Sequence, residues 1–230
     1  NRFIKDIEGI KISFFRKYNK KMENILIWGK SIKSDKYISK TKTFISVEDG
    51  FIRSVGLGGD LISPMSLLFD KNGIHYDPSK KSDLEELLQT RVVKNEELNR
   101  SKELIEQIKI KNISKYNIVN KNVFNINNSF NKKIVLVLGQ VETDNSIIFG
   151  VPNDKIAKTN YSLVRQVKKD YPNHYIIYKP HPDLEQGLRS YGSEDHLIGK
   201  IADFIANKSD IQNLFKISDR VAVFTSLGGF

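Results

Sequence analysis

Short apolar runs that end in glycine or in polar residues recur along the first half of the chain. Residues 24–29 (NILIWG) and 42–50 (KTFISVEDG) are two such runs, and each predicts a buried strand that ends in a loop. Residues 64–77 (PMSLLFDKNGIHYD) predict two short strands around a Lys-Asn-Gly turn. The first half of the chain is therefore predicted to begin with a small sheet.

Two helices and a linker are predicted to follow this sheet. In the segment SDLEELLQT, Ser82 is a candidate N-cap and Glu85 follows three residues later, which is the pattern of a capping box. Residues 95–111 predict an amphipathic helix with Leu98, Ile105 and Ile108 on one face. The next stretch, up to residue 132, is polar, rich in asparagine and without periodicity. The predicted organisation is a first domain at 1–118, a linker at 119–132 and a second domain at 133–230.

Strand and helix patterns alternate after this linker. The predicted elements are a strand in KIVLVLG, a helix at 160–171 with Leu163, Val164 and Val167 inward, a strand at 174–178, a helix capped by Ser209 with Gln212 three residues on, and a strand at 220–224. Such alternation predicts a parallel sheet with helices on its faces. A further helix would be expected to pack on the last strand, so the second lobe is expected to be truncated at the C-terminus.

Composition limits the classes of protein that fit. The chain has 230 residues, 39% of them hydrophobic, and no cysteine, which excludes disulfides and thiolate metal sites. No apolar run approaches the roughly 18–20 residues that span a bilayer, and the N-terminus has no signal-peptide pattern. A cytoplasmic protein is expected. The net charge of +10 favours anionic partners such as nucleotides, acidic sugars, nucleic acid or anionic lipid, but a lysine-rich proteome would give the same charge.

A polar tail follows each of four predicted strands, and three of the tails contain glycine. The tails are EDGFIRSVGLGG, GQVETDNS, KPHPD and TSLGG. Ligands of open parallel sheets bind beyond the carboxyl ends of the strands. If the four tails share one edge, they converge on one cleft.

Two of these tails suit a phosphate. Pro180 and Pro182 favour extended geometry at the residues before them, so Lys179 and His181 would present two nitrogen donors on one side. A rigid turn with an exposed lysine is the alternative. TSLGG offers two hydroxyl groups and free backbone amides where a helix would begin.

The other two tails carry carboxylates. Glu48 and Asp49 lie close to Arg53, which could form a structural ion pair or clamp a substrate carboxylate. Glu142 and Asp144 could act as a base and a nucleophile, or Asp144 or the next residue could cap a helix beginning at residue 146. No metal site is evident, because the four histidines lack ligand spacing and there is no Asp-x-Asp.

The ordered set of these motifs resembles the bacterial capsule polysaccharide biosynthesis proteins that act as retaining β-Kdo transferases. The matching stretches are IWGKS, VEDGFIRSVGLG, SLLFDKNGIHYD, SKKSDLEELL, SKYN, GQVETDNSI, YKPHPD followed by GLRSYG, and TSLGGF. They extend over residues 24–230. Each motif is modest by itself, but their order is specific.

This resemblance implies an α/β fold of two Rossmann-like lobes facing a cleft, similar to the glycosyltransferase-B architecture. It also implies a CMP-β-Kdo donor, a lipid or glycan acceptor and no metal cofactor. The essential carboxylate of the family falls on Asp144, with Asp49, Glu48 or Glu142 as the acceptor base. Substrate contacts are expected from Arg53, Ser54, Asn117, Gln140, Asn160 and Arg165, and nucleotide contacts from Lys179, His181, Pro182, Thr225 and Ser226.

Other functions stay open beside this one. The chain could be another nucleotide-sugar enzyme, such as a sialyltransferase-like enzyme or an epimerase, or a non-catalytic module that binds acidic glycan in a larger capsule polymerase. A nucleic-acid binder is disfavoured because aromatic and basic residues are not interleaved on any one stretch. Association with the cytoplasmic face of the inner membrane and with capsule assembly is expected from the family.

Overall fold

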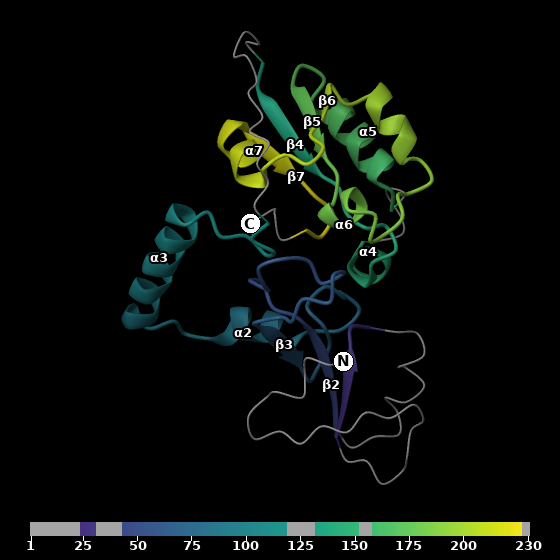
Figure 1. The fold of residues 1–230 in the computed structure, drawn as a ribbon. Coiled ribbons are helices and arrows are strands. Elements are labelled where there is room, and N and C mark those ends of the chain that lie inside the picture. Colours follow the sequence, from purple (N-terminus) through teal and green to yellow (C-terminus); the bar gives the residue numbers. More distant parts are fainter. Residues whose placement is uncertain (1–23, 31–42, 119–131, 152–157, 227–230) are drawn as a thin grey trace. The chain divides into compact units, whose positions relative to one another are not determined.

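The computed structural model describes residues 24–30, 43–118, 132–151 and 158–226 (Figure 1). Contacts divide the chain into two compact units, Asn1–Lys109 and Ile110–Phe230. The predicted linker lies outside the described residues except for Lys132, so the predicted domain boundaries stay a prediction. Among the described residues, no helix is both long and apolar enough to cross a membrane.

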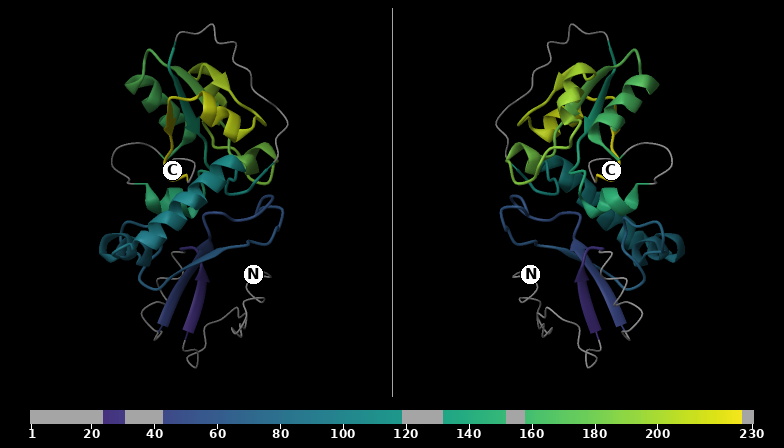
Figure 2. Two further views of the ribbon diagram at one scale, coloured as in Figure 1. Left: turned by 90° about the vertical axis from the view of Figure 1, so that its left-hand side faces the viewer. Right: turned by 90° about the vertical axis from the view of Figure 1, so that its right-hand side faces the viewer.

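The first unit contains a sheet of three described strands in the order β1-β2-β3. β1 (Asn24–Trp28) and β2 (Thr43–Asp49) run parallel and side by side, as Figure 2 shows. β3 (Leu67–Asp70) pairs with β2 in the antiparallel direction. The two predicted strands at 24–29 and 42–50 are thus confirmed.

The predicted hairpin at 64–77 is wrong in its second half, because no strand follows β3 there. The cause is Asp70, a buried residue at the end of β3. Its carboxylate accepts the backbone N–H groups of Asn72 (3.0 Å) and Gly73 (2.7 Å), and also that of Asp83 (3.1 Å). The Asp70 carboxylate therefore accepts hydrogen bonds from backbone N–H groups that would otherwise have paired with a neighbouring strand.

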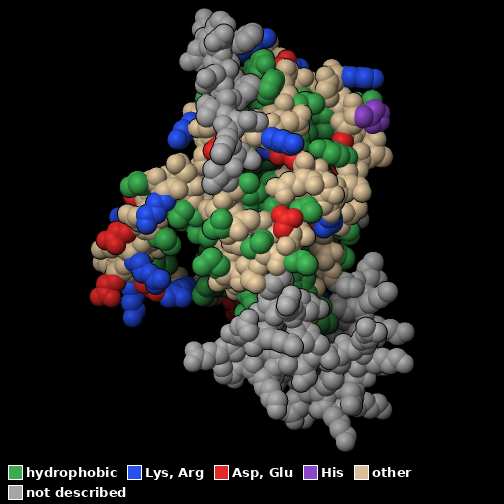
Figure 3. Space-filling view, in the orientation of Figure 1, with side chains coloured by type: hydrophobic (Ala, Val, Ile, Leu, Met, Phe, Trp, Pro, Cys, Tyr) green, Lys and Arg blue, Asp and Glu red, His purple; other side chains and the backbone are tan. Residues whose placement is uncertain are grey.

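The helices α2 (Asp83–Thr90) and α3 (Asn95–Ile110) follow this sheet. Ser82 caps α2 as predicted, since its side chain accepts the N–H of Glu85 at 3.1 Å. The helix predicted over 95–111 is confirmed as α3. Neither helix has a buried residue, and hydrophobic, basic and acidic side chains are interleaved over α3 (Figure 3).

The second unit is built on four parallel strands in the order β6-β5-β4-β7. Their bounds are Ile134–Leu138 for β4, Tyr175–Lys179 for β5, Phe204–Ile205 for β6 and Arg220–Ala222 for β7. Counted along the chain, this is the order third, second, first, fourth, which is the order of a doubly wound sheet. The predicted parallel sheet is confirmed.

Helices cover both faces of this sheet (Figure 1). The short helices α4 (Asn145–Gly150) and α6 (Pro182–Glu185) follow β4 and β5, the 3-10 helix η2 (Asp195–Lys200) precedes β6, and α5 (Asn160–Asp170) and α7 (Ile211–Ile217) are the longer helices. Val135 and Val137 of β4 pack with α5, and Leu136 and Leu138 pack with Leu214 of α7. The alternation of side chains along a strand places these pairs on opposite faces.

The predicted helix at 160–171 is confirmed, and Leu163, Val164 and Val167 are buried as expected. The predicted cap of the last helix was one residue too early. Asp210, not Ser209, is the N-cap of α7, because its carboxylate accepts the N–H groups of Gln212 (2.7 Å) and Asn213 (3.4 Å).

Candidate active site

The strand order of the second unit reverses between β4 and β7, and the loops after these strands meet there. Ligands of doubly wound sheets bind at such a switch point, outside the carboxyl ends of the strands. Gln140, a buried residue two positions after β4, joins the two loops. Its Oε1 accepts the N–H groups of Phe224 (3.2 Å), Thr225 (2.9 Å) and Ser226 (3.1 Å), and its Nε2 donates to Thr225 Oγ1 (2.9 Å). Two of the predicted tails therefore lie together.

Asn160, the first residue of α5, also binds the loop that follows β4. It is buried, and it exchanges two backbone–side-chain hydrogen bonds with Gln140, at 2.9 and 3.0 Å. Its own N–H donates to Glu142 Oε1 (2.7 Å), and its Nδ2 donates to Asp195 (3.3 Å). Gln140 and Asn160, two of the three predicted substrate-binding amides, thus make hydrogen bonds within the protein.

Glu142 and Asp195 form an acidic cluster beside this asparagine. Burial raises the pKa of Glu142, and the nearby carboxylates of Asp195 and Glu194 add to that effect. Burial also raises the pKa of Asp195. A Cβ at Gly192 would collide with the Glu142 carboxylate, so a larger residue there would force this side chain to move. The cluster is a place where a carboxyl group holds a proton more tightly than usual.

Asp144 stands at the N-cap position of α4, but its side chain does not cap the helix. Its backbone carbonyl accepts the N–H of Ile148 (2.9 Å), whereas its Oδ1 accepts a hydrogen bond from Arg189 Nη2 (2.9 Å). Both side chains are accessible, with 42% of Asp144 and 41% of Arg189 exposed. Burial of the rest raises the pKa of Asp144, and Arg189 and Lys115 oppose that rise. The carboxylate is therefore accessible and is not used as a helix cap.

Lys179 and His181 were predicted to present two nitrogen donors on one side, and in the structure one nitrogen of each residue has a partner within the protein. Lys179 is the last residue of β5, and its buried ammonium group pairs with Glu185 at 2.6 Å. Burial lowers the pKa of Lys179, and Glu185 opposes that effect. His181 is the N-cap of α6, and its Nδ1 accepts the N–H of Asp183 at 3.1 Å. Burial, with the nearby cations, lowers the pKa of His181 to about 4, so the imidazole is neutral at pH 7.

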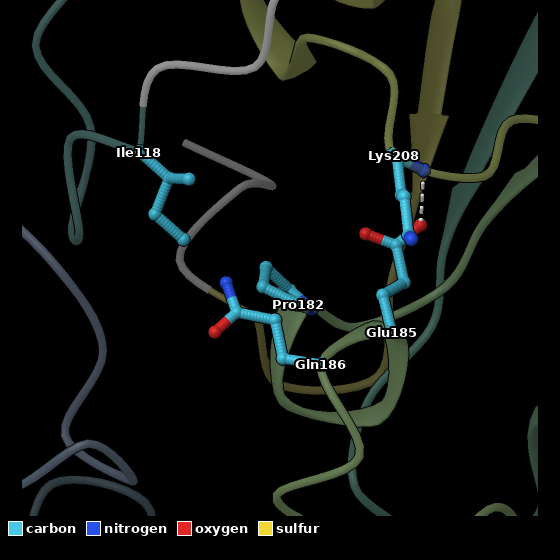
Figure 4. A pocket seen from close by; sticks show the side chains of 5 residues that line it. All are labelled: Ile118, Pro182, Glu185, Gln186 and Lys208. Carbon is cyan, nitrogen blue, oxygen red and sulfur yellow. Dashed lines mark hydrogen bonds between the residues drawn. The ribbon is translucent and has the colours of Figure 1, made fainter.

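A cavity of about 230 Å³ lies beside this tail (Figure 4). Its lining residues are Ile118, Pro182, Glu185, Gln186 and Lys208. The Lys208 N–H donates to Glu185 at 2.6 Å, so Glu185 joins the end of β5 to the loop after β6. Pro182, a predicted nucleotide contact, thus borders a cavity that both apolar and polar residues line.

The first unit holds its own acid and arginine at the end of β2. Arg53 Nε pairs with Asp49 Oδ2 at 2.7 Å, and Arg53 is buried. Its Nη1 donates to Ser54 Oγ (2.9 Å), which in turn donates to the carbonyl of Gly56 (2.8 Å). Glu48 Oε1 accepts the Asp49 N–H at 3.0 Å. Of the two alternatives predicted for this tail, the structure contains the ion pair between Arg53 and Asp49.

Two further predicted contacts serve other purposes in the structure. Arg165 is exposed on α5, whose inward residues form the core. Asn117 closes a turn with Ser114, since each accepts the backbone N–H of the other, at 2.8 and 3.0 Å. Arg189 was missed as a site residue, although it lies in the GLRSYG motif that the sequence offered. No group of three or more metal-ligating side chains occurs among the described residues.

Comparison with known proteins identifies the family of this chain. The family model described as "Capsule polysaccharide biosynthesis protein" matches residues 23–230. The chain belongs to this family. The resemblance predicted from the ordered motifs is thereby confirmed.

Two curated relatives are capsule or lipopolysaccharide proteins. LipA of Neisseria meningitidis serogroup B, a capsule polysaccharide modification protein, is 37% identical over 186 residues, which are 81% of this chain and 26% of LipA. LpsZ of Rhizobium meliloti, a lipopolysaccharide-processing protein, is 37% identical over 80% of this chain and 42% of LpsZ. The chain therefore spans less than half the length of either relative.

Two solved structures of Thermosulfurimonas dismutans KpsC share the fold. The β-Kdo 2,7 transferase has a TM-score of 0.68 and 36% identity, and the match covers 90% of this chain and 60% of that one. The β-Kdo 2,4 transferase has a TM-score of 0.74 and 26% identity, with 89% and 64% covered. These neighbours are glycosyltransferases by name.

Proposed function

We propose that the protein is a retaining glycosyltransferase that transfers β-Kdo from CMP-β-Kdo to a glycan or lipid acceptor in capsule synthesis. The observation that carries this proposal is the accessible Asp144 carboxylate, which lies in the loop after β4 and makes no side-chain cap to the helix that follows. A carboxylate in such a place can attack a sugar. The similarity to two KpsC transferases supports Kdo as the sugar.

The reaction would take place in two displacements. Asp144 attacks the anomeric carbon of Kdo while the bond from that carbon to the phosphate oxygen breaks, and CMP leaves with the electron pair. The acceptor hydroxyl then attacks the same carbon, its proton passes to a base, and the Asp144 carboxylate is released. Two inversions give net retention of configuration.

The second unit supplies a candidate for each remaining role. Glu142 lies two residues from Asp144, and its raised pKa makes it a stronger base than an ordinary carboxylate. Arg189 is the accessible guanidinium beside Asp144, and it suits the carboxylate of the sugar better than Arg53, which is buried in its ion pair. Thr225, Ser226 and His181 stay the candidates for the CMP phosphate, as neutral hydrogen-bonding groups.

The setting of the reaction is part of the same proposal. A two-lobed glycosyltransferase-B arrangement, with the acceptor in the first unit, fits a reaction between two large substrates. A place at the cytoplasmic face of the inner membrane, near the capsule assembly machinery, fits an anionic acceptor and a net charge of +10. No metal is assigned a role.

The test is turnover by the purified protein with CMP-β-Kdo and an acidic glycan or a lysophospholipid. We expect a new β-linkage by NMR, and a mass gain of one Kdo on the protein when the acceptor is left out. Asp144→Asn should abolish both, with a loss in kcat of about 1000-fold or more. Asp170→Asn is the matched control, because Asp170 is an exposed carboxylate of the same unit whose side chain accepts a hydrogen bond from Gln166 and from no other described residue.

Two results would contradict the proposal. Turnover of UDP-sugars alone would point to another nucleotide-sugar enzyme. Full activity of Asp144→Asn in an assembled capsule polymerase would instead indicate a glycan-binding module without chemistry of its own.

A further inference from the structure

A second cavity, in the first unit, belongs to none of the residues assigned a role above. It measures about 110 Å³ and lies against one face of β2, between that strand and the segment after β3. Its lining residues are Gly29, Lys30, Phe44, Ser46, Lys71, Asn72, Gly73, Ile74, Asp77 and Lys80. All of these residues except Phe44 and Ser46 of β2 lie in three of the motifs that carry the family resemblance, IWGKS, SLLFDKNGIHYD and SKKSDLEELL.

The charge of this lining is positive. Lys30 forms an ion pair with the buried Asp77 and lies 3.4 Å from Ser79 Oγ. Burial disfavours the charged form of Asp77, yet the hydrogen bonds from Lys30 and Ser79 hold its pKa below the usual value. Lys71 and Lys80 make no ion pair with any described residue. Two positive charges thus border the cavity after Asp77 has neutralised Lys30.

The wall that carries these lysines is held by a network of carboxylates. Asp70 binds the N–H groups of Asn72 and Gly73, as described above. Asp83 accepts the Lys71 N–H at 2.8 Å and the Asn72 Nδ2 at 2.6 Å. The backbone around Lys71 is therefore held by hydrogen bonds to two carboxylates.

We infer that this cavity is a binding site for a single anionic group, a carboxylate or a phosphate. A volume of about 110 Å³ has room for about four groups the size of a water molecule, which suits a phosphate or carboxylate and excludes a whole eight-carbon sugar. Lysine binds such anions as a point charge with several donors. The side-chain amide of Asn72 lines the cavity too, and it has a second N–H besides the one that it donates to Asp83.

The identity of the anion follows from the proposed function, and this step rests on it. The donor is assigned to loops of the second unit, so the anion in the first unit belongs to the acceptor. An acidic glycan offers a sugar carboxylate, and a phospholipid headgroup offers a phosphate. Both have the chemistry that the cavity binds.

The experiment measures anion binding directly, without turnover. Inorganic phosphate, glycerol 3-phosphate and free Kdo are each titrated into the protein, with amide NMR shifts of residues 71–80 as the readout. Lys71→Glu/Lys80→Glu should weaken binding by about tenfold or more, because two attractive charges become repulsive. Lys94→Glu/Lys102→Glu is the matched control, since both lysines are exposed in the same unit, line no described cavity and give the same change in net charge.

The outcomes separate the inference from the proposed function. Saturable shifts confined to the cavity and lost in the Lys71/Lys80 variant support the site. A preference for phosphates points to a phospholipid acceptor, and binding of Kdo points to an acidic glycan. Equal binding by both double variants, or no shift at residues 71–80, overturns the inference even if Kdo transfer is observed. Anion binding at the cavity without Kdo transfer would leave the site standing and overturn the proposed function.

Discussion

Two acid–arginine pairs in this molecule have the same chemistry and opposite surroundings. Asp49 ends β2 and pairs with Arg53 at 2.7 Å, and the two side chains are 17% and 4% exposed. Asp144 follows β4 and contacts Arg189 at 2.9 Å, and both side chains are about two-fifths exposed. The first pair joins residues four apart, whereas the second joins segments 45 residues apart.

The difference shows which pair is available for chemistry. A buried pair that loses one partner leaves an uncompensated charge in the protein, so it is difficult to replace and difficult for a ligand to enter. An accessible pair costs little to separate, because water solvates both groups. The Asp49–Arg53 pair is therefore expected to stabilise the first unit, and the Asp144–Arg189 pair to meet the substrate.

The largest effect on stability is expected at the buried pair. Arg53→Met keeps most of the apolar contact of the side chain but leaves Asp49 without its cation, which should lower the free energy of unfolding by about 2–4 kcal/mol. Trp28, the single tryptophan of the chain, lies in β1 of the same unit, so its fluorescence during urea unfolding reports on this unit.

The control for this variant is Arg165→Met, which removes an exposed arginine and should leave the unfolding midpoint unchanged. Asp144→Asn should likewise leave stability unchanged while it abolishes transfer. If Arg53→Met were as stable as the parent protein and had lost only substrate affinity, Arg53 would be the sugar clamp after all.

A smaller loss of stability is expected at Gln140, which joins the loops after β4 and β7. Gln140→Met has a similar shape but leaves three backbone N–H groups without their acceptor, which should cost about 2 kcal/mol. Hydrogen exchange at the amides of Thr225 and Ser226 should become faster. Gln140→Glu keeps the accepting oxygen and should retain slow exchange, so equal exchange in both variants would contradict this role.

The sequence predicted β4, α5 and β5 of the second unit because each has a clear apolar pattern, and it missed short elements such as β6 and α6. β4 is a continuous apolar run, and α5 places Leu163, Val164 and Val167 on one face. The hairpin at 64–77 failed because one aspartate, Asp70, competes with a strand for the backbone N–H groups. The cap of α7 was misplaced because serine and aspartate cap helices about equally well and stand next to each other there.

The meeting of the loops after β4 and β7 could be predicted from the sequence, but the hydrogen bonds between them could not. Parallel strands bring their carboxyl ends to one edge, so the tails that carry Gln140 and Thr225 could be expected to meet. Which groups satisfy one another depends on contacts 84 to 86 residues apart, and no local pattern encodes those. Lys179 shows the limit most clearly, because its partner Glu185 is only six residues away in sequence but is the last residue of α6, so the pairing depends on how the chain turns between β5 and α6.

The smallest expected effect concerns the accessible pair and is a change in pH dependence. Asp144 must be ionised to attack, and the positive charge of Arg189 favours that ionised form. Without the guanidinium the pKa of Asp144 rises further, so protonation removes activity at a higher pH than in the parent protein. In Arg189→Ala, the ratio of kcat at pH 5 to kcat at pH 8 should therefore fall by about tenfold relative to that of the parent. Arg189→Lys keeps the charge and should restore most of this ratio, whereas a profile that Arg189→Ala leaves unshifted would show that Arg189 does not act through Asp144.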